Sequence, residues 1–131
     1  MRLDEALYSY LSGTAALTAL VGLRIYPVIA PESASAPYLV LTEISKINEP
    51  VSGGSGPDYE VRYQVSVWAD TYASARAVAV QVSTALKNYS GTMGGAGGVV
   101  VSIIYEETES EFYEPTTEKY HIAMDYLIWH Q

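Results

Sequence analysis

The sequence contains no cysteine and only two histidines, and these scarcities exclude several kinds of chemistry. Without cysteine there is no disulfide framework, no thiolate zinc site and no thiol nucleophile. Basic residues are also few, since 7 Lys and Arg stand against 15 Asp and Glu, which gives a net charge of -8. Such a chain lacks the positive surface with which proteins neutralise nucleic-acid phosphates. Ordinary nucleic-acid binding is therefore not expected.

Long apolar runs are missing as well. The first residues, MRLDEALYSYL, have no apolar stretch behind a basic start, so they predict neither a signal peptide nor a membrane span. A chain of 131 residues has the size of one domain and can bury about two-thirds of its unfolded surface. No linker divides it. We therefore expect a single domain over residues 1–131, made in the cytoplasm.

Phenylalanine occurs once, whereas tyrosine occurs 12 times. Tyrosine combines an apolar ring with a polar tip and is enriched at protein interfaces. Tyrosine also fits the outer faces of ordinary strands, where its β-propensity is high. The tyrosine content thus favours an interaction surface or exposed strands, and composition alone does not choose between them.

The stretch from Tyr59 to Leu86 contains the clearest strand, and the clearest helix follows it. Its first part alternates apolar and polar side chains, with Val61, Tyr63, Val65 and Val67 on one face. Asp70 or Thr71 then supplies an oxygen that can cap a new helix. The helix carries an apolar stripe formed by Ala75, Val78, Ala79, Val82 and Leu86. Because the turn is short, this helix should fold back onto the sheet.

The remaining pattern completes an α+β fold. Leu3, Leu7, Tyr10 and Leu11 predict a first helix, and Thr14 is expected to cap a second short helix over Ala15 to Val21. Further strands are expected from Tyr38 to Ser45, from Val99 to Ile104 and from Lys119 to His130. The predicted architecture is a mainly antiparallel sheet of about four strands, with a central helix and a short N-terminal helical pair packed on it.

Two glycine-rich segments need separate interpretation. Gly91 to Gly98, GTMGGAGG, lacks the Lys and Ser or Thr of a phosphate-binding loop and leads into a strand, so a flexible connection is expected. The segment Glu49 to Asp58, EPVSGGSGPD, is too long for a tight hairpin turn. It is expected to form a mobile hairpin arm.

No catalytic, metal or cofactor site is predicted. His121 and His130 would lie on one strand about 30 Å apart and on opposite faces, so they cannot form one site, and His121 is expected to be an exposed strand residue. Six glutamates lie between Glu106 and Glu118 without the spacing of a calcium loop. A solvated strand edge is the favoured interpretation of these glutamates.

Four segments in this order resemble one family. They read LYSYLSGTAALTALVGLRIYP, APYLVLTEIS, YEVRYQVSVWADTYASARAVAVQV and FYEPTTEKYHIAMDYLIWH. Their order and spacing are similar to those of the small tail-completion proteins of long-tailed bacteriophages and prophages, also called tail terminators or head-to-tail joining proteins. The resemblance extends from Leu7 to His130.

The resemblance implies a structural virion protein with no cofactor. Usually six copies of such a protein form a ring on the head-proximal end of the tail tube, which ends tube growth and joins the tail to the head connector. The implied partners are further copies of the chain, the tube protein and the connector or stopper protein. DNA passes through the ring without specific binding, no membrane is involved, and assembly occurs in the bacterial host cytoplasm.

Ring closure requires a heterologous interface between copies. We expect the strand edges and the hairpin arm to contact neighbouring subunits or the tube. The residues expected to make the arm contacts are Val51, Ser52, Gly53, Gly54, Ser55, Gly56, Pro57 and Asp58. The alternative is a small monomeric or dimeric module that binds a protein or a ligand without catalysis. A pocket with convergent polar groups on the sheet would favour this alternative.

Overall fold

The computed structural model describes residues 1–49 and 58–131, which form three helices and one sheet. The helices are α1 (Leu3–Ser12), α2 (Ala15–Val21) and α3 (Tyr72–Leu86). The strands are β1 (Ile25–Pro27), β2 (Tyr38–Glu49), β3 (Asp58–Ala69), β4 (Gly91–Met93), β5 (Val99–Glu114) and β6 (Lys119–His130). The predicted α+β class is confirmed.

The sheet has six strands in the order β1-β2-β3-β6-β5-β4, rather than about four. The four long strands, β2, β3, β6 and β5, are antiparallel to their neighbours, as predicted. The two additional strands have 3 residues each and lie at opposite edges. Strands this short do not show an alternation that a sequence pattern can detect.

The β4 strand corrects the expectation of a flexible connection over Gly91 to Gly98. Gly91 and Met93 pair with Val101 and Val99, so this segment begins as the first strand of a hairpin with β5. The turn contains Gly94, Gly95 and Gly97, all with positive φ. Residues other than glycine rarely adopt this backbone conformation, so the glycines permit the turn.

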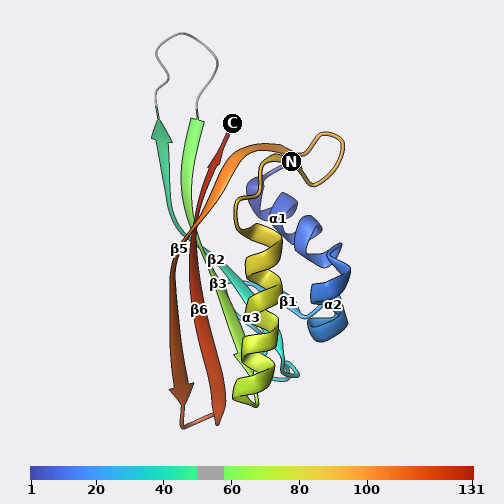
Figure 1. Cartoon of the computed structure of the whole chain (residues 1–131), viewed down its shortest axis with the longest axis vertical. Helices are drawn as coiled ribbons and strands as arrows, with labels where there is room; N and C mark the ends of the chain where they lie inside the picture. The colour runs from blue at the N-terminus through green and yellow to red at the C-terminus, as the bar shows by residue number, and fades with distance from the viewer. Residues whose placement is uncertain (50–57) are drawn as a thin grey trace.

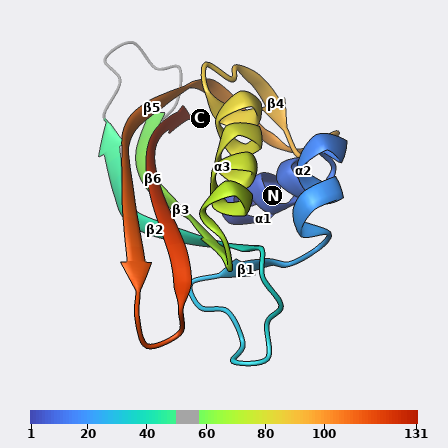
Figure 2. The same cartoon turned by 60° about the horizontal axis from the view of Figure 1, so that its bottom comes forward.

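The three helices lie on one face of the sheet (Figure 1). The helix α3 runs along the sheet, with α1 and α2 beside it, and in the described ranges the other face carries no helix (Figure 2). The predicted apolar stripe of α3 and the alternating apolar residues of β3 are buried, so both patterns are confirmed. The fold therefore has one covered face and one open face.

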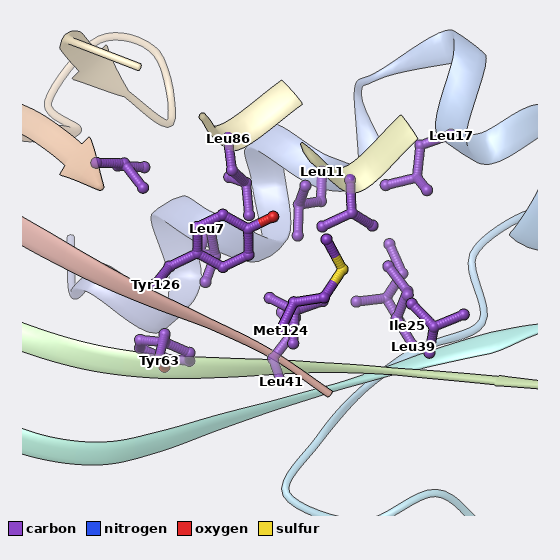
Figure 3. Close-up of a cluster of buried hydrophobic side chains, with 14 of the residues drawn as sticks. Leu7, Leu11, Leu17, Ile25, Leu39, Leu41, Tyr63, Leu86, Met124 and Tyr126 are labelled. Atoms are coloured by element: carbon purple, nitrogen blue, oxygen red, sulfur yellow. The ribbon is translucent and has the colours of Figure 1, made fainter. Parts of the chain in front are cut away.

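The core lies between the helices and the sheet (Figure 3). Leu7 and Leu11 from α1, and Leu86 from α3, are fully buried. They face the sheet, where Met124 and Tyr126 of β6 extend toward them (Figure 3). This strand is the centre of the core because it pairs with β3 on one side and with β5 on the other.

Two helix starts had candidate caps in the sequence. At α3 the side chain of Thr71 accepts a hydrogen bond of 3.1 Å from the backbone N–H of Ser74, which is an N-cap interaction. At α2 the Thr14 hydroxyl donates to the carbonyl of Tyr10 at 2.9 Å and makes no cap. Thr14 therefore occupies the predicted N-cap position, but its hydroxyl is directed toward the end of α1 and accepts no bond from the α2 backbone.

Candidate assembly surfaces

The predicted arm lies almost wholly outside the described residues. Val51 to Pro57 belong to the segment that the structure does not describe, and Asp58 is the first residue of β3, where it pairs with Glu49. The strands that lead to this segment, β2 and β3, are each 12 residues long. The prediction of arm contacts therefore stays a prediction.

Both edges of the sheet are partly open. The strand β1 pairs with β2 at Leu39, Val40 and Leu41, and from Thr42 to Asn48 no other strand of the described chain pairs with this edge. At the opposite edge β4 pairs with residues 99–101 of β5. The backbone N–H of Asn88 then donates to the carbonyl of Ile104, and the N–H of Ile104 donates to the carbonyl of Tyr89. Beyond it, residues 106–114 form the second open edge.

Both outer long strands contain irregular pairing. The register shifts between Glu43 and Ser45 in β2. In β5 it shifts between Val101 and Ile103 and again between Glu106 and Thr108. Bulges of this kind bend and twist a strand, and they are frequent at sheet edges.

The helix-free face carries a row of aromatic rings that crosses the sheet. Trp68 of β3 stacks on His121 of β6 with centroids 4.1 Å apart. On one side of this pair, the ring centroid of Phe112 of β5 lies 5.7 Å from that of His121. On the other side, the ring centroid of Tyr38 of β2 lies 6.4 Å from that of Trp68. Tyr26 of β1 meets Tyr38 edge to face. Five neighbouring strands thus contribute one ring each to an aromatic row formed by Tyr26, Tyr38, Trp68, His121 and Phe112.

His121 is not the exposed strand residue that the sequence predicted. It is half-buried between Trp68 and Phe112, because its register brings it opposite both rings. Burial lowers the pKa of His121 from its ordinary value, and the nearby Glu114 carboxylate opposes this shift. His130 lies at the other end of β6 and stacks on Tyr59, so the two histidines do not form one site.

Three of the glutamates in the acidic segment have partners. Glu107 pairs with Arg62 of β3 at 2.6 Å, and Glu109 pairs with Arg76 of α3 at 3.0 Å. Glu106 accepts a hydrogen bond of 2.7 Å from the Ser83 hydroxyl of α3. These contacts connect β5 to β3 and to α3. The acidic segment is therefore a strand edge that also helps to hold the sheet and the helix together.

A groove of about 590 Å³ lies beside the open part of β2, near the start of α1. Leu41 and Tyr63 line it, and Arg2, Glu43 and Lys46 lie among its charged lining residues. Burial, with contributions from Glu43 and Asp4, raises the pKa of Tyr63 to about 12, so this tyrosine is neutral at physiological pH. The groove therefore offers apolar surface with charges of both signs.

The described residues contain no cluster of three or more His, Cys, Asp and Glu side chains that is arranged to hold a metal ion. The groove has one histidine among its lining residues, His130, whose Nδ1 lies 2.9 Å from the carbonyl of Gln131. None of the helices in the described ranges has the length and hydropathy that a membrane crossing requires.

The sequence interpretation missed the aromatic row and the exact extent of the open edges. The row depends on cross-strand register, which places residues 38, 68, 121 and 112 at one level. A usable signal was the aromatic or histidine residue near one end of each long strand. The extent of the edges depends on β1 and β4, which were not among the predicted strands of the sheet.

Comparison with known proteins identifies the family. The family model described as "Tail completion protein gp17" matches residues 5–131. A chain from a structure titled "Virion of native gene transfer agent (GTA) particle" has the same fold, with a TM-score of 0.76 at 21% identity over 98% of this chain and 93% of that chain. No curated protein matches the sequence. The chain therefore belongs to the tail completion protein gp17 family, and as a member it is a structural component of a phage tail and not an enzyme.

Proposed function

We propose that this protein acts as a single domain that completes the tail at its head-proximal end. Several copies, with six as the expected number, form a ring that ends growth of the tail tube and provides the docking surface for the head connector. The observation that carries the proposal is the family match, which includes all residues from 5 to 131. The ring would assemble in the host cytoplasm and remain in the virion.

The charge of the chain supports a channel through which DNA passes. A net charge of -8 repels phosphates, so DNA would slide through the ring without being held. On the helix-free face, the positive charge of Arg62 is paired with Glu107, and that of Lys119 with Asp70. That face therefore has little capacity to bind a phosphate backbone.

We assign further contacts to the segment Val51 to Asp58, between β2 and β3. Its composition of Gly, Ser and Pro is compatible with contacts to a partner. The partner would be the neighbouring copy or the tube protein. Deletion of Gly53 to Gly56 tests this assignment, because normal rings and normal joined particles from the deletion variant would contradict it.

The main experiment is electron microscopy of a lysate of the parent phage with this gene disrupted, and again with the gene supplied in trans. We expect filled heads beside unattached or overlong tails, and repair by complementation. A variant with Leu7→Asp is a suitable negative control, since a charge at this fully buried position should prevent folding. Normal joined virions without the gene would contradict the proposed function.

A further inference from the structure

We propose that neighbouring copies in the ring join their sheets, with the open edge of β5 in one copy pairing antiparallel with the open edge of β2 in the next. This inference rests on the proposed ring and specifies its interface. The two open edges are residues 42–48 of β2 and residues 106–114 of β5. An unpaired row of backbone N–H and C=O groups is a template for a further strand.

The strand directions fit this arrangement. The long strands β2, β3, β6 and β5 alternate in direction across the sheet, so β2 and β5 run in opposite directions. Rotation about a ring axis preserves strand direction along that axis. The β5 strand of one copy therefore meets the β2 strand of the next as an antiparallel neighbour, and the alternation continues without a break.

The open segments lie at different heights, which requires a stagger between copies. The middle of the open β2 edge is Ser45, which pairs with Arg62 of β3. Arg62 pairs with Leu127 of β6, and Leu127 pairs with Tyr105 of β5. Ser45 and Tyr105 therefore lie at the same height in the sheet. The middle of the open β5 edge is Ser110. Tyr105 and Ser110 are five residues apart, and one of these residues lies in the bulge between Glu106 and Thr108. The stagger between copies is therefore about four residues, or about 14 Å at ~3.4 Å per residue.

This stagger has the size that a closed sheet needs. Each copy adds four long strands, which are about 19 Å wide at ~4.8 Å per strand. A shift of about 14 Å over that width tilts the strands by about 35° from the ring axis. Closed barrels have strand tilts of about 35 to 45°. The short strands β1 and β4 block pairing at equal height, so they favour the staggered arrangement.

Exposed apolar side chains accompany both open edges. Ile44 and Ile47 of β2 are each 50% exposed, and Phe112 and Tyr113 of β5 are 56% and 50% exposed. Phe112 belongs to the helix-free face and Tyr113 to the helix-covered face. A strand from a neighbouring copy would cover apolar surface on both sides of the sheet, which gives the pairing a hydrophobic contribution.

Charge favours this pairing over a symmetric dimer. The open edge of β5 carries five glutamates and no basic residue, namely Glu106, Glu107, Glu109, Glu111 and Glu114. Arg62 and Arg76 pair with two of them, Glu107 and Glu109, so three glutamates keep an uncompensated negative charge. Two such edges facing each other would repel. The open edge of β2 has one glutamate and one lysine, Glu43 and Lys46, and is neutral in sum. The β5 edge therefore prefers the β2 edge of another copy, which is a heterologous contact that can close a ring.

Cysteine cross-linking tests the pairing directly, since the natural chain has no cysteine. The anchor is Thr42→Cys, on the helix-free face of β2, and it is combined in turn with a single cysteine at each position from Thr108 to Tyr113. Within one chain β2 and β5 are three strand spacings apart, about 14 Å, which exceeds the ~7 Å limit for a disulfide. A cross-link therefore reports a contact between copies.

The expected result is an alternating pattern in assembled, joined particles. Thr42→Cys should cross-link with cysteines at Ser110 or Phe112, on the same face, and not with those at Glu109, Glu111 or Tyr113. Moving the anchor by one residue to Glu43→Cys should invert the pattern. A loop contact or a face contact would not produce this inversion, because only paired strands alternate with a period of two.

The outcomes separate this inference from the proposed function. Normal rings and joined particles with no cross-links, or with cross-links that do not alternate, overturn the strand pairing and leave the ring intact. Failure of the wild-type chain to form rings or to repair joining overturns the proposed function, and the pairing with it. Each cysteine variant is first checked for repair of joining under reducing conditions, so that only folded protein is scored.

Discussion

Trp68 and His121 stack face to face on the helix-free side of the sheet, with ring centroids 4.1 Å apart and planes 7° apart. The two residues are direct partners in the register of β3 and β6. Stacking on a tryptophan restricts access of water to the imidazole, and Nε2 of His121 has no hydrogen-bond partner in the described part of the chain. The neutral imidazole is therefore favoured at this position.

The first prediction is that His121 titrates below the ordinary histidine value of about 6.5. In a Trp129→Phe background, Trp68 is the remaining tryptophan and its fluorescence reports the charge of the stacked ring. We expect a fluorescence transition with its midpoint below about 6.5 that is absent in the His121→Gln control. A midpoint at or above this value would contradict the burial of the ring.

The second prediction concerns stability and follows from the same pKa shift. Because the folded state lowers the pKa of His121, the unfolded chain binds more protons between the folded pKa and about 6.5. The contribution of His121 to the free energy of unfolding should have its full value above about pH 6.5, and it should decrease as the pH falls below this value. Urea denaturation from pH 5 to 8 measures this, and the difference between wild type and His121→Gln isolates the histidine. A difference that stays constant over this range would exclude the linkage.

The third prediction compares two residues of α3 with opposite environments. Leu86 is fully buried against the sheet, whereas Val80 is 50% exposed. Leu86→Ala should lower the free energy of unfolding by about 2 to 5 kcal/mol, because it removes buried methyl groups and leaves a cavity. Val80→Ala should change it by less than about 0.5 kcal/mol. Chemical denaturation measures both, and equal costs would be inconsistent with this packing of the helix.

The fourth prediction concerns the start of α3. Thr71→Ala removes the bond to the Ser74 N–H and should lower the free energy of unfolding by about 1 kcal/mol. The adjacent Asp70 pairs with Lys119 at 3.0 Å, but its side chain is 66% exposed. Asp70→Ala should therefore cost less than about 1 kcal/mol. If Asp70→Ala proved the costlier change in thermal or urea unfolding, the assignment of the cap would be wrong.

The fifth prediction concerns a hydroxyl in the core. Tyr126 is fully buried, and its hydroxyl has no hydrogen-bond partner within the usual geometric limits among the described residues. The nearby Ser83 donates its own proton to Glu106. Tyr126→Phe should leave the free energy of unfolding unchanged or raise it, because the change removes an unpaired polar group. A loss of more than about 1.5 kcal/mol would show that the hydroxyl is bonded after all.

Much of the fold could be predicted from sequence because local periodicity reflects burial. The alternation from Val61 to Val67 and the stripe from Ala75 to Leu86 identified a strand and a helix whose apolar sides are buried in the structure. The terminal strand was predicted at its observed bounds, Lys119 to His130. Family resemblance then supplied a virion role that no single side chain indicates.

The sequence by itself thus determined the helices, the places of the long strands and the acidic, cysteine-free character of the chain, since each follows from local pattern or composition. It did not determine the full length of two strands, since β2 continues past Ser45 to Glu49 and β5 continues past Ile104 to Glu114. Tertiary structure alone decided the strand order, the two short edge strands, the position of His121 between Trp68 and Phe112, and the segments of β2 and β5 that remain unpaired. These features depend on register between residues far apart in the chain. A one-residue slip of register would reverse the face on which each side chain lies, and local pattern does not specify which distant strand becomes the neighbour.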